Sequence, residues 1–114
     1  MRRPFIAGNW KMNLNRESSV SLASEVLEKL KQMANRQQVE VAVCPPSCYL
    51  EAVATAVDPA ILGVGAQNMY HETEGAFTGE VSPQISASST RRVRSIPLTI
   101  LPHWSDPPIR SRQP

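Results

Sequence analysis

The first apolar run of the chain covers residues 4–10. Asn9 and Trp10 stand at its end, and Lys11 follows directly. Lysine carries a compact ammonium charge that suits a phosphate group or an oxyanion that develops during a reaction. Two positions beyond the end of a strand, such a side chain could project toward a ligand. From spacing alone, a solvated lysine on a turn is the simpler interpretation, and both readings stay open at this point.

The remaining chemically active side chains form no complete site by their spacing. Cys44 and Cys48 are four positions apart without a second pair, and His71 and His103 stand at no metal-ligand spacing. We therefore expect no metal site and no disulfide. Three glutamates could act as acids or bases, but periodicity assigns them to a polar loop: Glu72, Glu74 and Glu80.

Residues 63–68, Gly-Val-Gly-Ala-Gln-Asn, begin like a dinucleotide-binding fingerprint. Asn68 occupies the place of the third glycine, and no helix is predicted to open there. Glycines in a tightly packed strand explain this stretch better. We therefore expect no organic cofactor.

Three short strands must position these residues. Apolar or β-branched runs cover residues 4–10, 39–44 and 61–66. Each run has the length and the flanking turn signals of a buried strand. In the second, Pro45-Pro46 ends the run because proline lacks the N–H that a central strand needs.

Two helices are predicted between these strands. Asn15 can cap the first, and Glu17 places an anion in its first turn. Ser47 can cap the second, over residues 49–57. The apolar face of the first helix is predicted from steps of three and four along Val20, Ala23, Leu27, Leu30 and Ala34.

The resulting β-α-β-α-β order is typical of a parallel α/β sheet covered by helices. In such sheets the ligand site lies beyond the carboxyl ends of the strands. Here those ends are residues 9–11, 44–46 and 67–69. We expect these three segments to lie together.

Length and composition limit the class of protein. The 114 residues amount to one small domain, with 41% hydrophobic and 19% charged residues. No run approaches the roughly 18 apolar residues of a membrane span, so we expect no membrane association. The opening run breaks at Gly8-Asn9, too early for a signal-peptide core, and the expected location is cytoplasmic.

The charge is divided unevenly along the chain. Residues 1–83 hold seven Lys/Arg and nine Asp/Glu, whereas residues 84–114 hold five Arg, only Asp106 as an acid, no lysine and five of the ten prolines. This shift predicts a boundary at Pro83. Beyond it we expect an irregular, disordered tail.

Four strings of the first part carry a family resemblance. They are uncommon and occur in order: GNWKMN at 8–13, CPP at 44–46 followed by Tyr49-Leu50, GAQN at 65–68, and GAFTGEVSP at 75–83. Over about residues 4–83, the chain resembles triosephosphate isomerases. The resemblance implies an isomerase of glycolysis and gluconeogenesis that interconverts dihydroxyacetone phosphate and D-glyceraldehyde 3-phosphate through an enediol, without metal or organic cofactor.

The resemblance also implies roles for particular residues. Lys11 would be the catalytic and substrate-binding cation, and Asn9 would orient Lys11 and contact the triose phosphate. The segment 67–82 resembles the long third loop, which enters a pocket of the partner subunit in a homodimer. The dimer-loop residues implied are Gln67, Gly75, Phe77, Thr78, Gly79 and Glu80. Thr78 would approach the partner's substrate site, and the two glycines would supply unusual backbone angles.

The implied fold is the (β/α)8 barrel of about 250 residues, of which this chain would supply the first three β/α units. The glutamate base, the closing loop and the phosphate-binding loops belong to later strands in the family. His103 follows Ile100-Leu101-Pro102, a weak likeness of the family's histidine string. We therefore expect this chain alone to be inactive, and we attribute the tail to a shifted reading frame.

Two other functions stay open. Arg91, Arg92 and Arg94 could contact nucleic acid phosphates, although no nucleic-acid fold is recognised. Alternatively, the chain could be a non-catalytic fragment that docks on an intact isomerase subunit through residues 67–82.

Overall fold

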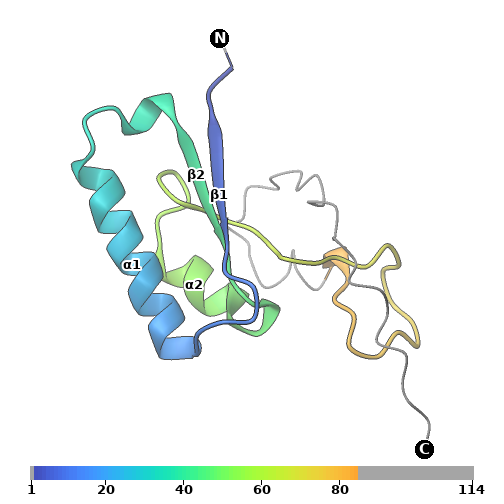
Figure 1. Cartoon of the computed structure of the whole chain (residues 1–114). Coiled ribbons are helices and arrows are strands. Elements are labelled where there is room, and N and C mark those ends of the chain that lie inside the picture. Colours follow the sequence, from blue (N-terminus) through green and yellow to red (C-terminus); the bar gives the residue numbers. More distant parts are fainter. Residues whose placement is uncertain (1, 85–114) are drawn as a thin grey trace, which may run out of the picture.

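Three strands form one parallel sheet in the computed structural model, which describes residues 2–84 (Figure 1). The strands are β1 (Phe5–Asn9), β2 (Glu40–Cys44) and β3 (Gly63–Val64), in the order β1-β2-β3. Ile6 pairs with Val41 and Asn9 with Cys44, so β1 and β2 end at the same level. The predicted β-α-β-α-β order is confirmed.

The predictions for the tail fall outside this range. Of residues 84–114, only Gln84 belongs to the part that the structure describes, so the arginines at 91, 92 and 94 and His103 lie beyond it.

Helix α1 (Arg16–Gln32) begins as its sequence predicts. The Asn15 Oδ1 atom accepts a hydrogen bond from the Ser18 N–H at 2.9 Å, and the Ser18 hydroxyl accepts one from the Asn15 N–H at 2.9 Å. Two backbone donors that the helix leaves free are thereby satisfied. Glu17 adds the predicted negative charge to the first turn.

The buried face of α1 differs at both ends from the prediction. The buried residues of the helix are Ser19, Ala23, Leu27 and Leu30. At the first end, Ser19 is buried and Val20 only half-buried. Ala34 is exposed because the backbone becomes extended at Met33, before the next step of the pattern is reached. The predicted place of Ala34 on the apolar face is therefore wrong.

The second helix starts without the predicted Ser47 cap. A short 3-10 helix η2 (Ser47–Tyr49) leads into α2 (Leu50–Ala56), and neither element has a side-chain cap. The Tyr49 N–H donates to the Pro46 carbonyl at 2.9 Å. This backbone turn satisfies a donor that a serine cap would otherwise take.

The third strand is shorter than the predicted run over 61–66. The N–H groups of Ile61 and Leu62 donate to the Asp58 carbonyl at 3.0 and 2.9 Å, so both residues belong to the turn after α2. Leu62 is nevertheless fully buried. An apolar run can serve the core from a turn as well as from a strand, and periodicity alone does not separate the two.

Among the described residues, an apolar cluster holds the two helices against the sheet. Figure 1 shows these helices beside the strands. The cluster contains Ala23, Leu27 and Leu30 of α1, residues of α2, and Val43 and Val64 of the sheet. Strand β1, in contrast, is exposed along its whole length, and Ile6 keeps 58% of its surface in contact with solvent. The prediction of a buried strand over this run is therefore wrong, because none of the β1 residues belongs to the apolar cluster that the helices cover. None of the helices formed by the described residues is long and apolar enough to span a membrane.

Candidate functional site

The carboxyl ends of the strands meet as predicted. The Trp10 N–H donates to the Cys44 carbonyl at 3.1 Å, which joins the segments after β1 and β2. The Gln67 side chain, beyond β3, donates from Nε2 to the carbonyls of Lys11 and Cys44, both at 2.8 Å. Segments far apart in the chain thus form one edge of polar groups.

Lys11 has an unusual backbone conformation at this edge. Its φ angle is 54°, in the left-handed region, which costs about 1–2 kcal/mol for a residue with a side chain. The Lys11 N–H donates to Asn9 Oδ1 at 2.9 Å, and the Lys11 carbonyl accepts from Gln67. Each hydrogen bond contributes about 0.5–1.5 kcal/mol net, so together they offset the backbone strain.

The Lys11 side chain is exposed, and its ammonium makes no hydrogen bond or ion pair with another residue of the described range 2–84. The turn that carries it is fixed by Asn13, whose side-chain amide donates to the Trp10 carbonyl at 2.8 Å. An unpaired cation on a fixed backbone can receive an anion without first breaking an internal ion pair. The two predicted residues, Asn9 and Lys11, lie together through the hydrogen bond from the Lys11 N–H to Asn9 Oδ1.

The residues predicted for a partner-facing loop separate into two places. Gln67 is tied to the strand ends, whereas the exposed residues around the loop tip extend away from the sheet (Figure 1). The Tyr70 N–H donates to the Val81 carbonyl at 2.9 Å, which closes the base of the loop. The exposed residues are Gly75, Phe77, Thr78, Gly79 and Glu80.

Two glycines give the loop tip its shape. Gly75 has a φ angle of 145°, and a Cβ atom there would lie 2.6 Å from Cε2 of Phe77. Gly79 has a φ angle of 87° and open space around it. A side chain is thus disfavoured at both positions by the backbone conformation, and at Gly75 it would in addition require the Phe77 ring to move.

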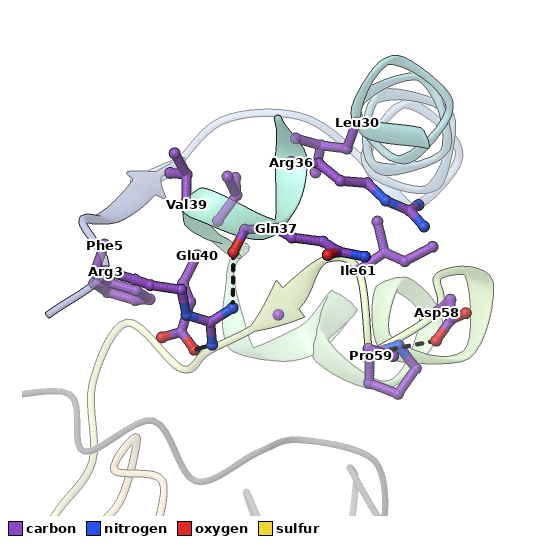
Figure 2. Close-up of a pocket in the computed structure, with 13 residues that line it drawn as sticks. Arg3, Phe5, Leu30, Arg36, Gln37, Val39, Glu40, Asp58, Pro59 and Ile61 are labelled. Atoms are coloured by element: carbon purple, nitrogen blue, oxygen red, sulfur yellow. Dashed lines mark hydrogen bonds and ion pairs between the residues drawn. The ribbon is translucent and has the colours of Figure 1, made fainter. Parts of the chain in front are cut away.

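A cavity of about 360 Å³ lies at the opposite, amino ends of the strands (Figure 2). Most of its charged groups are already engaged: Arg3 forms an ion pair with Glu40 and donates to the Gln37 carbonyl at 3.2 Å, and Asp58 accepts from the Ala60 N–H at 2.9 Å, whereas Arg36 has no such partner within the described residues. Ligand sites of parallel sheets lie beyond the carboxyl ends instead. The Lys11 edge is therefore the better candidate site.

A second cavity, of about 480 Å³, is formed by the long loop. Glu72, Glu74 and Glu80 are among its lining residues, together with the rings of Tyr70 and Phe77, whose centroids are 4.5 Å apart. Three carboxylates repel an anionic ligand, so this cavity does not suit a phosphate.

The two cysteines are free thiols with different surroundings. Cys48 is exposed, whereas Cys44 is buried, and burial raises the pKa of the Cys44 thiol because it disfavours the thiolate. Residues 2–84 contain no group of three His, Cys, Asp or Glu side chains that could hold a metal ion.

Comparison with known proteins shows to which family the chain belongs. A family model described as triosephosphate isomerase matches residues 4–93, most of the 114-residue chain. The chain belongs to the triosephosphate isomerase family. The family match runs past Pro83, the boundary predicted from composition.

Curated triosephosphate isomerases align with the same part of the chain. The Phocaeicola vulgatus protein is 43% identical over 89 residues, covering 78% of this chain and 35% of that protein. The Carboxydothermus hydrogenoformans protein is 48% identical over 83 residues (73% and 32%), and the Rhodopirellula baltica protein is 49% identical over 81 residues (71% and 31%). The chain spans about a third of the length of the triosephosphate isomerases that it matches.

Sequence reasoning missed the hydrogen bonds that Gln67 makes. The available signal was its position at the predicted carboxyl end of the third strand, beside the ends that carry Lys11 and Cys44. The family resemblance instead implies that Gln67 belongs to the partner-facing loop that it begins.

Proposed function

We propose that this chain carries the lysine part of a triosephosphate isomerase substrate site. The complete enzyme interconverts dihydroxyacetone phosphate and D-glyceraldehyde 3-phosphate. The observation that supports the proposal most is the unpaired Lys11 ammonium on a backbone fixed by Asn9 and Gln67, at the carboxyl ends of a parallel sheet. An anionic triose phosphate is the ligand that suits this cation.

The reaction moves a proton between neighbouring carbon atoms. A base removes a proton from the carbon beside the carbonyl, and negative charge develops on the carbonyl oxygen. That oxygen gains a proton to give the enediol, the neighbouring hydroxyl loses its proton and becomes the new carbonyl, and the former carbonyl carbon takes the proton from the base. Lys11 would hold the anionic substrate and stabilise the enediolate charge, because a fixed cation stabilises charge that develops in the transition state. Asn9 would keep Lys11 oriented and contact the substrate.

The other half of this chemistry needs a glutamate base and a neutral histidine that polarises the carbonyl. Within residues 2–84, the single histidine is His71, which lies exposed in the long loop and not at the strand ends near Lys11. Its Nε2 atom is 3.7 Å from Oε1 of Glu72. We therefore expect this chain to bind triose phosphate weakly and to show negligible turnover by itself. Its cytoplasmic location and its role in glycolysis follow from the same proposal.

The test is a titration of the full 114-residue chain with dihydroxyacetone phosphate, in which amide chemical shifts report binding. A coupled isomerase assay measures turnover separately. We expect shifts centred on residues 9–13 that disappear in Lys11→Ala and persist in Lys29→Ala. Lys29 is a suitable control because it is an exposed lysine on α1, away from the strand ends. Binding that does not depend on Lys11 would refute the site, and Lys11-dependent turnover would refute the expected inactivity.

A second candidate function is docking on an intact isomerase subunit. The exposed loop that holds the Tyr70–Phe77 ring pair supports it, since a protruding loop with aromatic side chains suits a pocket on a partner. Sedimentation of the chain with an intact relative should reveal a mixed complex that Phe77→Ala weakens. Independent sedimentation of the two proteins would exclude this function.

A further inference from the structure

Gln67 connects the ends of two strands through a single side-chain amide. Its Nε2 atom donates to the Lys11 carbonyl and to the Cys44 carbonyl, each at 2.8 Å. Lys11 is 56 positions away along the chain, and Cys44 is 23 positions away. The Cys44 carbonyl also accepts from the Trp10 N–H, so Gln67 completes a junction that backbone pairing begins.

We propose that Gln67 is the positioning residue that holds Lys11 in its substrate-binding conformation. This inference rests on the proposed function of Lys11 and assigns to Gln67 a role distinct from partner contact. Gln67 fixes the carbonyl side of Lys11 while Asn9 fixes the N–H side. With both adjoining peptide groups held, the left-handed backbone determines the direction in which the lysine side chain leaves the main chain.

The chemistry of the amide explains why glutamine suits this place. A primary amide has two N–H donors and can serve two carbonyl acceptors from one nitrogen. A glutamate of the same length is ionised at neutral pH and can only accept, so it would place a carboxylate against two carbonyl oxygens. Methionine has a similar length but no donor. These two substitutions remove the junction in different ways.

The experiment measures amide hydrogen exchange at Lys11 in the full chain and in three variants. In Gln67→Glu and Gln67→Met, we expect exchange of the Lys11 N–H to accelerate about tenfold at neutral pH, the factor expected from losing roughly one net hydrogen bond. Gln38→Glu makes the same charge change at an exposed site of the 3-10 helix η1 (Arg36–Gln38), away from the strand ends, and should leave Lys11 exchange unchanged.

A pH series adds a readout that a general loss of packing would not produce. As the pH falls below the ordinary pKa of glutamate, the new carboxyl group gains one O–H donor, so Gln67→Glu should regain part of the Lys11 protection. Gln67→Met should show no such recovery. Amides of the buried residues Leu27 and Val53 report whether each variant keeps its fold.

The outcomes separate this inference from the proposed function. Lys11 exchange that stays unchanged in a folded Gln67→Met variant overturns the positioning role. If Gln67→Glu unfolds, Gln67→Met decides alone. Dihydroxyacetone phosphate binding weakened in both Gln67 variants, with Leu27 and Val53 still protected, supports the role. Failure of the unsubstituted chain to bind this ligand overturns the function of Lys11 instead.

Discussion

At the scale of single residues, Cys44 combines two roles that its sequence neighbours do not reveal. Its carbonyl accepts hydrogen bonds from Trp10 and Gln67, and its thiol is buried. Cys48 lies only four positions away and is exposed. The difference arises because Cys44 ends a central strand, whereas Cys48 belongs to the 3-10 turn that follows.

The two thiols should therefore differ in reactivity. With a disulfide reagent at pH 8, we expect one fast thiol in the folded chain, lost in Cys48→Ser, and a second that reacts only as the chain unfolds. Equally fast reaction of both thiols in the folded chain would contradict this difference in reactivity.

The raised pKa of the Cys44 thiol also makes stability depend on pH. Because burial raises this pKa, the contribution of the buried thiol to stability is present at neutral pH. It is lost as the pH rises from the ordinary pKa of a thiol through the raised pKa of Cys44.

At the scale of elements, the two helices begin differently although both follow a residue able to cap. Asn15 forms a complete capping box at the start of α1, whereas Ser47 makes no cap before α2. The sequence predicted the first because all its parts are local. It failed at the second because the proline pair sets a 3-10 turn, and Tyr49 uses the Pro46 carbonyl.

Removal of the α1 cap should have a measurable cost. Asn15→Ala loses the hydrogen bond to the Ser18 N–H, and we expect the free energy of unfolding to fall by about 1 kcal/mol. Asn35→Ala is the matched control, because Asn35 precedes η1 without a side-chain cap and its loss should change stability by less than about 0.5 kcal/mol. Urea unfolding followed by circular dichroism compares them; equal losses would argue against the capping role.

At the scale of the whole molecule, strand β1 stands out. Within residues 2–84 it pairs only with β2, so its other edge has no strand partner there. Phe5 and Ile6 keep 44% and 58% of their surface exposed. In a closed barrel of about 250 residues, each such strand has neighbours on both sides. An exposed apolar edge strand favours association between chains.

If chains associate through the exposed edge of β1, a charged residue on that strand should reduce the association. The full chain should self-associate as its concentration rises, and Ile6→Lys should shift it toward the monomer because a charged edge resists pairing. Leu22→Lys, on the partly exposed surface of α1, serves as the control and should leave association unchanged. Sedimentation velocity distinguishes the variants. A monomeric unsubstituted chain at high concentration would refute the edge mechanism.

The composition change near Pro83 leads to a prediction about the gene. We propose that a single insertion or deletion near codon 84 shifts the frame of the arginine- and proline-rich segment. Resequencing the DNA, with translation in all three frames, should then recover further family motifs in a neighbouring frame. If the frame is confirmed as written and no neighbouring frame carries such motifs, the segment is a real part of this protein.

Short-range patterns of residues were enough to predict the local features and the family. Strand runs, the α1 cap and the strand ends that meet at Lys11 depend on short-range pattern, and the family strings occur in order along the chain. Three features emerged only in the folded chain: the length of β3, the exposure of β1 and the junction at Gln67. These features depend on which carbonyls the sheet register brings within hydrogen-bond distance, and residues 56 positions apart carry no local signal of that proximity.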